Sequence, residues 1–125
     1  MDENQVSNKV IGAAIEVHRT LGPGLLESIY ENALAYELEL RHIGLRRQMD
    51  IPVVYKGRRL EGHFRVDVLV ADSVIVEVKA IDCLLEVHKA QLLTYLRLVD
   101  KRLGLLINFN APVLSRSIRR VVNNL

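Results

Sequence analysis

The sequence predicts an α/β domain, bordering on α+β, in which helices cover a mixed sheet of four or five strands. Three observations lead to this prediction. The chain begins with apolar residues at helical spacing, residues 64–79 alternate with the period of a strand on either side of a turn, and residues 103–109 are almost wholly apolar. An apolar run of that kind is typical of a strand that is covered on both faces.

Length and composition favour one globular domain over residues 1–125. Hydrophobic residues make up 50% of the chain and charged residues 26%, and the formal net charge of +2 is too small to indicate a nucleic-acid partner by itself. The single cysteine, Cys83, excludes a disulfide framework and a thiol-based zinc site. No apolar run is long enough to span a membrane, and the acidic N-terminus is unlike a signal peptide. We therefore expect a cytoplasmic protein without a membrane partner.

Two helices are expected first. The helical pattern from about Asn4 to Leu21 ends at Gly22-Pro23-Gly24, which stops the helix and redirects the chain. A second helix should run from about Leu25 to His42, with Gly44 as its C-terminal cap. Glu27 lies in the first turn of this helix, where a carboxylate stabilises the helix dipole. This effect alone accounts for an acid at that position. The side chains expected to face inward are Leu26, Ile29, Tyr30, Ala33, Leu34, Leu38 and Ile43.

Three antiparallel strands should follow. Residues 45–55 are expected to form the first, with Pro52 indicating a sheet edge or a bulge. Lys56-Gly57 is a hairpin turn, after which the chain returns from Arg58 into the strand that carries Asp67. A second turn at 71–73 leads into the third strand.

This second hairpin is predicted to pair symmetrically about Asp72, which places Asp67 opposite Glu77. Side chains two residues apart on a strand share a face, so Lys79 should lie beside Glu77 and Arg65 beside Asp67. A slip of one residue would separate these charged side chains. The residues expected on the opposite face are Val66, Val68, Val70, Val74, Val76 and Val78.

Such a cluster suggests a metal site. Two facing carboxylates repel each other, and a divalent cation removes that penalty. Mg²⁺ takes one or two carboxylates and leaves positions for phosphate oxygens, while a neighbouring lysine can stabilise charge that develops on phosphorus. The alternative is a surface hairpin with cross-strand ion pairs, which contribute little to stability.

A third helix is predicted from Ile81 to Val99, before the apolar strand. Its buried stripe should contain Leu85, Leu92, Leu96 and Val99. Beside that stripe, His88, Gln91 and Tyr95 share one face, and they are candidate site residues only if this face looks toward the hairpin acids. The unit from the third strand to the apolar strand is then a right-handed parallel crossover.

After Ala111-Pro112 a last helix is expected. Its buried residues should be Leu114, Ile118 and Val121 or Val122, and its outer face would carry Arg116, Arg119 and Arg120. An arginine face of this kind is more often solvated than a phosphate-binding site.

Several motifs resemble those of one nuclease superfamily. Asp67 followed by Glu77-Val-Lys79 resembles the core motif of the PD-(D/E)XK nucleases, although Val66 stands where the superfamily has a proline. Gln91-Leu-Leu-Thr-Tyr95 is similar to the Gln-x-x-x-Tyr element of the RecB-like branch. Gly24-Leu-Leu-Glu27-Ser-Ile-Tyr30 fits the pattern that names the GxxExxY protein family, a small group within the superfamily. The resemblance covers essentially the whole chain.

The resemblance implies a restriction-endonuclease-like fold and metal-assisted hydrolysis of phosphodiester bonds, with DNA as the expected substrate. Asp67 and Glu77 would hold one Mg²⁺ or Mn²⁺, and Glu27 would ligate it directly or through water. Lys79 would orient the attacking water or stabilise the transition state. The residues expected to hydrogen-bond DNA phosphates or site waters, without reading base sequence, are Gln91, Tyr95 and His88.

Two other functions stay open at this point. A nuclease-like fold can bind nucleic acid or a protein partner without cutting, and the small size and modest charge are consistent with such a module. The hairpin charges can also be ion pairs in a structural protein. A domain this small with apolar edge strands can form a homodimer.

Overall fold

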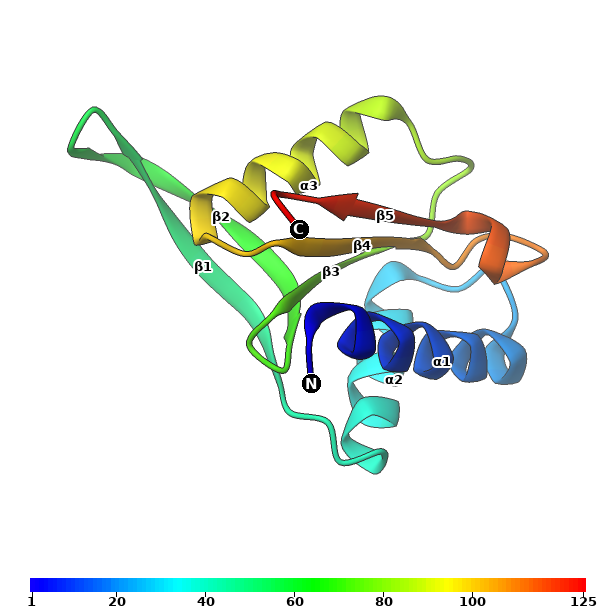
Figure 1. Ribbon diagram of the computed structural model, residues 1–125. Helices are drawn as coiled ribbons and strands as arrows, with labels where there is room; N and C mark the ends of the chain where they lie inside the picture. The colour runs from blue at the N-terminus through cyan, green and yellow to red at the C-terminus, as the bar shows by residue number, and fades with distance from the viewer.

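A five-stranded mixed sheet lies between two layers of helices (Figure 1) in the computed structural model, which covers residues 1–125. Its strands follow the order β1-β2-β3-β4-β5, and only β3 and β4 are parallel. The predicted class, an α/β or α+β fold with four or five strands, is confirmed. The elements are α1 (Glu3–Leu21), α2 (Glu27–Leu40), β1 (Leu45–Tyr55), β2 (Arg58–Val70), β3 (Val74–Lys79), α3 (Glu86–Val99), β4 (Leu103–Asn108), the 3₁₀ turn η1 (Leu114–Ser117) and β5 (Ile118–Val122).

Helices α1 and α2 cover one face of the sheet. Helix α1 begins at Asp2, whose carboxylate accepts a hydrogen bond from the Gln5 N–H at 2.8 Å and so caps the helix. None of the helices combines the length and the apolar composition that a membrane-spanning segment needs. The larger apolar cluster of the protein forms between these helices and the central strands. Its α1 members are Val6, Val10, Ala13, Ala14 and Val17, and its β2 and β3 members are Val68, Val70, Val74, Val76 and Val78.

Helix α2 turns a narrower face to the core than predicted. Its buried residues form a stripe of Tyr30, Leu34 and Leu38, spaced four apart, with Glu31 and Ala35 on one side of them. Leu26 and Ile29, which were expected inside, are 73% and 42% exposed. Leu26 precedes the first helical residue, and Ile29 lies about 100° around the helix from Tyr30, so neither can join the stripe.

Helix α3 covers the other face of the sheet and packs closely on β4. A Cβ atom added to Gly104 would lie 2.9 Å from carbon atoms of the Leu92 side chain, so the glycine makes room for the helix. The helix begins at Glu86 rather than at Ile81, and Leu85 is exposed instead of buried. The Asn108 side chain bonds both the N–H and the C=O of Ile81, which holds this segment out of helical conformation.

The β2–β3 hairpin has the predicted register. Backbone pairs join Val68 to Val76 and Val70 to Val74, so the pairing is symmetric about residue 72. The predicted alternation fails at Val66, which lies in the apolar cluster under α3 rather than with Val68.

An irregularity in β1 lies opposite the point where the side chains of β2 switch from one face of the sheet to the other. Gln48, opposite Asp67, has a φ of 52° and interrupts the β1–β2 pairing between Arg47 and Met49. A local departure from strand geometry of this kind redirects side chains.

Beyond this point, the β1–β2 hairpin projects from the body of the protein (Figure 1). It closes at Lys56-Gly57, where both residues have positive φ as a two-residue type I′ turn requires. The predicted turn is therefore confirmed.

The prediction of a last helix is wrong. The chain after Pro112 forms the short turn η1 and then the edge strand β5, which pairs antiparallel with β4. The spacing of Leu114, Ile118 and Val121 suits a helix, but β-branched residues dominate 118–122 and β4 has a free edge beside them. Leu114 and Val121 are buried as predicted, and Arg119 and Arg120 are exposed on β5.

Candidate active site

Asp67 and Glu77 lie side by side where the pairing of β2 and β3 ends. Beyond the Val68–Val76 pair, the Asp67 carboxylate accepts a hydrogen bond from the Val78 backbone N–H at 3.0 Å. The Asp67 N–H in turn donates to Glu77 Oε1 at 3.5 Å. A side chain thus takes the place of a backbone partner, and the two strands separate around a pair of carboxyl groups.

This pair cannot ionise freely. Glu77 is only 7% exposed, and burial raises its pKa to about 9, with the adjacent Asp67 charge adding to the shift. Burial also raises the pKa of Asp67. In the free protein at neutral pH the pair therefore retains a proton, because two buried carboxylates in contact cannot both carry a charge without a compensating cation.

Lys79 and Glu27 complete the cluster that the sequence predicts. Lys79 is half-buried at the end of β3, and its positive charge acts to lower the pKa of Glu27, Asp67 and Glu77. Glu27 is the first residue of α2. Its pKa is raised, chiefly by partial burial and also by the charge of Asp67, so this exposed residue lies near the pair. A pair of acids and one ammonium group thus meet at the ends of two strands, and Glu27 lies near them at the start of a helix.

Tyr30 holds the segment that leads to Glu27. Its hydroxyl donates to the Gly22 carbonyl at 2.5 Å and accepts from the Leu25 N–H at 3.1 Å. The ring is fully buried and stacks on Phe109 with centroids 4.7 Å apart. Tyr30 thus fixes the turn before α2, and with it the position of Glu27.

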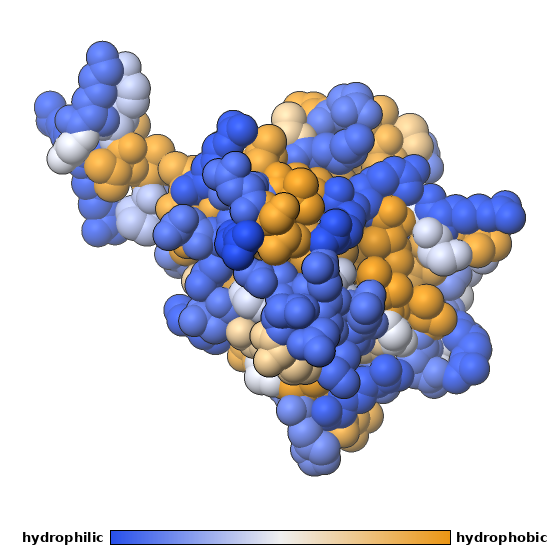
Figure 2. All heavy atoms as spheres, viewed as in Figure 1, coloured by the Kyte–Doolittle hydropathy of each residue, from blue (hydrophilic) through white to orange (hydrophobic).

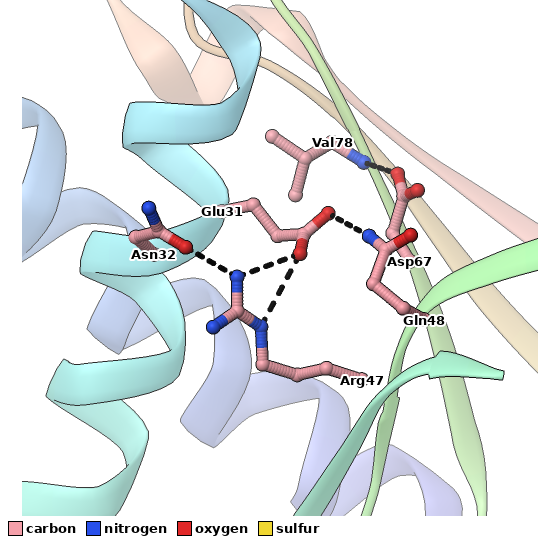
Figure 3. Close-up of polar contacts among 6 residues, drawn as sticks. All are labelled: Glu31, Asn32, Arg47, Gln48, Asp67 and Val78. Carbon is pink, nitrogen blue, oxygen red and sulfur yellow. Dashed lines mark hydrogen bonds and ion pairs between the residues drawn. The ribbon is translucent and has the colours of Figure 1, made fainter.

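A second buried acid, Glu31, supports the cluster from α2. Figure 3 shows its carboxylate between Arg47 and Gln48, which donate to its two oxygens at 2.8 and 2.7 Å. Arg47 also donates to Asn32. Glu31 is close enough to raise the pKa of Asp67, but both of its oxygens are already bonded. It is therefore a supporting residue, and nothing in the sequence identifies Arg47 or Gln48 as its partners.

The face of α3 that carries Tyr95 does look toward the acids. Burial raises the pKa of Tyr95, and the charges of Glu77 and Asp67 raise it further. The Tyr95 ring stacks on Phe64 with centroids 4.2 Å apart. Tyr95 thus lies near the acids, and the exposed Gln91 lies one helical turn before it on α3.

His88 has a different contact. Its Nδ1 accepts a hydrogen bond from the Leu85 N–H at 2.9 Å at the start of α3. The structure therefore ties His88 to the helix terminus, and no contact joins it to the acids.

Asn108 is a positioning residue that the sequence prediction missed. It pairs with Lys79 across β3 and β4 and is 2% exposed. Its side chain bonds Ile81 on both sides, at 3.0 and 2.9 Å, and so fixes the chain directly after Lys79. A polar residue at the end of a wholly apolar strand is the signal that could have identified it.

Arg65 does not join the cluster, contrary to the predicted alternation. Its Nε donates to the Asp50 carboxylate at 3.0 Å across the β1–β2 hairpin, and both side chains are exposed. The change of face at Val66 and Asp67 is the reason, because it places Arg65 on a different side of the strand from the acids.

The largest hollow of the protein lies elsewhere. It has a volume of about 430 Å³ and is bounded by apolar side chains of the β1–β2 hairpin and the end of α3, including Met49, Val66 and Val99. None of the three acids lines it. The geometry of the carboxylates, and not the size of a cavity, therefore indicates the site.

The residues present fit a divalent cation held by two acids. No three Asp, Glu, His or Cys side chains are arranged to hold a metal ion together. Mg²⁺ commonly uses one or two carboxylates and completes its shell with water, and the buried Glu77 lies beside Asp67, where a cation would offset the charge of both. Glu27 faces this pair but does not form a three-acid ligand group with it.

Comparison with known proteins agrees with this arrangement. The family model of the PD-(D/E)XK nuclease superfamily matches residues 4–121, which include every acid of the cluster. No curated protein and no solved structure gives a significant match. With its mixed sheet and its Asp67, Glu77 and Lys79 in the order of the superfamily motif, the chain belongs to the PD-(D/E)XK nuclease superfamily.

Proposed function

We propose that this protein is a metal-dependent nuclease that hydrolyses phosphodiester bonds in DNA. The observation that carries the proposal is the contact between the half-buried Asp67 and the buried Glu77 at a strand end, with Lys79 two residues beyond Glu77. Membership of a nuclease superfamily supports a nucleic acid as the substrate class. The narrower likeness to the GxxExxY family and a cytoplasmic location remain predictions.

In this proposal Asp67 and Glu77 hold Mg²⁺ or Mn²⁺, and Glu27 contacts the cation through water. When bound, the cation supplies positive charge that lowers the pKa of a water molecule and offsets the phosphate charge. The water oxygen forms a bond to phosphorus and releases a proton to solvent, the bond between phosphorus and the leaving oxygen breaks, and that oxygen takes up a proton.

The chain's own side chains orient these groups. The Lys79 ammonium, next to the acids, donates a hydrogen bond to the attacking water or to a phosphate oxygen as negative charge develops. The Tyr95 hydroxyl and the Gln91 amide donate to the phosphate from α3. These contacts hold the backbone in place and read no base.

The test compares purified wild-type protein with Asp67→Asn and Glu77→Gln on labelled single- and double-stranded DNA and on RNA, with EDTA, Mg²⁺ or Mn²⁺. We expect cleavage that needs the cation and is lost in both variants. Asp72→Asn is the matched control, because Asp72 is exposed at the turn of the same hairpin and its φ of 53° suits asparagine. Full cleavage by either site variant would overturn the assignment.

A non-cleaving binding module is the second candidate. The internal hydrogen bonds of both acids and the lack of a three-acid ligand group favour it. It predicts that wild-type protein binds DNA or a protein partner equally in EDTA and Mg²⁺, and that no cation produces cleavage.

A further inference from the structure

The outer part of the β1–β2 hairpin, residues 52–63, is an arm without a partner in the fold. All of its residues are exposed except the half-buried Val53. The apolar side chains at its base, Met49, Ile51 and Phe64, pack against the cluster under α3, so the arm is anchored on the body. Figure 2 shows hydrophilic side chains gathered at the tip, beyond an apolar neck.

The arm is a bent two-stranded ribbon. Three residues of β2, 60–62, oppose the single residue Val53 of β1, because Pro52 pairs with His63 and Val54 with Arg59. Gly62 has a φ of 98° in this bulge, which bends the strand. A strand pair of this length that protrudes without covering any core contributes little to folding, so its retention calls for another explanation.

Positive charge is concentrated on this arm. It carries Lys56, Arg58 and Arg59 against one acid, Glu61, and this surplus equals the net charge of +2 of the whole chain. The ion pairs between the two strands of the hairpin join Asp50 to His63 and Arg65, nearer its base. The three cations at the tip thus have no acidic partner, and Lys56 lies over the Tyr55 ring at 5.4 Å.

We propose that residues 52–63 bind the phosphate backbone of double-stranded DNA at a distance from the site where the DNA is cut. Unpaired arginines donate in pairs to phosphate oxygens, and a two-stranded ribbon is narrow enough to enter the major groove. The inference rests on the proposed nuclease function, and it names the duplex as the form of substrate.

The length of the arm sets the distance between the two contacts. Arg58 and Asp67 are nine residues apart on β2. At about 3.3 Å per residue, the tip reaches up to about 30 Å from the acids. This distance corresponds to about nine base pairs at 3.4 Å each. The arm should therefore matter for long duplexes and not for short ones.

The test measures DNA binding in EDTA by fluorescence anisotropy, so that it needs neither a cation nor cleavage. The variant Lys56→Gln/Arg58→Gln/Arg59→Gln is compared with Arg116→Gln/Arg119→Gln/Arg120→Gln. The second triple removes the same charge from η1 and β5 at the opposite edge of the sheet. The probes are a duplex of about 20 base pairs and a DNA hairpin with a stem of about six base pairs.

We expect the arm variant to bind the long duplex about tenfold or more weakly, and the short stem as wild-type protein does. The slope of log affinity against log salt should become shallower by up to about 2.7, since each of the three lost phosphate contacts changes it by about 0.9. The β5 variant should lose less affinity for the long duplex than the arm variant does.

Three results would overturn the inference. They are unchanged binding of the long duplex by the arm variant, an equal loss with the β5 variant, and an effect of the arm variant only on binding to phosphatidylserine vesicles or on dimerisation. Failure of the nuclease assignment is seen separately, as cleavage that survives Asp67→Asn or never occurs. Salt-dependent binding of DNA by the arm would still be observed if the nuclease assignment failed in either of these ways.

Discussion

The Val78 N–H donates a hydrogen bond to the Asp67 carboxylate at 3.0 Å, at the point where the backbone pairing of β2 with β3 stops. The acid is thus part of the sheet as well as of the candidate site. A substitution at Asp67 changes both the framework and the chemistry, so activity and stability have to be measured on the same variants.

The stability of the free protein should fall as pH rises from about 5 to about 9. The pKa of Glu77 is about 9 in the folded protein, against an ordinary value of 4.5. Between these values the folded state binds more protons than the unfolded state, so the free energy of unfolding decreases with pH. The decrease is at most about 1.4 kcal/mol per pH unit. Urea unfolding at a series of pH values measures this slope.

Glu77→Gln should flatten that slope, because glutamine carries no proton to lose. Glu61→Gln on the exposed arm is the control and should leave the wild-type slope intact. A Glu77→Gln protein with the wild-type pH dependence would show that Glu77 does not hold the proton.

Tyr95→Phe should separate chemistry from packing. The substitution keeps the ring that stacks on Phe64 and removes only the hydroxyl that faces the acids. We expect DNA cleavage to fall about tenfold, or about 1.4 kcal/mol of transition-state stabilisation. The free energy of unfolding should change by less than about 0.5 kcal/mol.

Tyr95→Ala serves as the comparison, since it also removes the aromatic pair and should cost about 1 kcal/mol more in stability. Equal cleavage by Tyr95→Phe and wild-type protein would show that the hydroxyl has no part in the reaction.

Arg47→Met should destabilise the protein by about 1–3 kcal/mol, because it leaves the Glu31 carboxylate buried without its cation. The double variant Glu31→Gln/Arg47→Met should recover part of this loss. Thermal or urea unfolding of the two single variants and the double variant gives the coupling energy.

The control for this cycle is the more exposed pair of Arg41 with Glu37 on the same helix. Arg41→Met should cost no more than about 0.5 kcal/mol. Similar losses at Arg41 and Arg47 would mean that the Glu31 network adds no more than a surface ion pair.

Gly104→Ala should cost about 1–3 kcal/mol, because the new Cβ meets the Leu92 side chain at 2.9 Å and pushes α3 from the sheet. Gly44→Ala is the matched control, since no atom lies within 4 Å of a Cβ there. The double variant Gly104→Ala/Leu92→Val should be more stable than Gly104→Ala alone. A loss of the same size at Gly44 would indicate a backbone effect and not a packing clash.

Local pattern was sufficient to predict most of the sheet. The alternation on both sides of Asp72 defines the register, and the structure has that register. The bounds predicted for β1 also agree with the structure. The last helix was wrongly predicted because residues 114–122 satisfy the helical spacing, and only the free edge of β4 decides for a strand.

The acids of the site were predictable because they follow a motif, but their support was not. The partners of Glu31 come from β1, about sixteen residues further along the chain, and the Asn108 side chain bonds Ile81 from 27 residues away. The positive φ of Gln48 likewise has no local signature in the sequence. Such contacts depend on how elements meet in space, which spacing along one element does not reveal.

The early position of α1 in the chain has a consequence for synthesis on the ribosome. Its five core residues pack against strands that are translated more than forty residues later, and its His18 bonds the Ala111 carbonyl at 2.7 Å, 93 residues away. A nascent chain thus exposes this apolar helix until almost all of the domain has emerged. Co-translational folding is therefore late, and chaperones that bind amphipathic helices have a long interval in which to act.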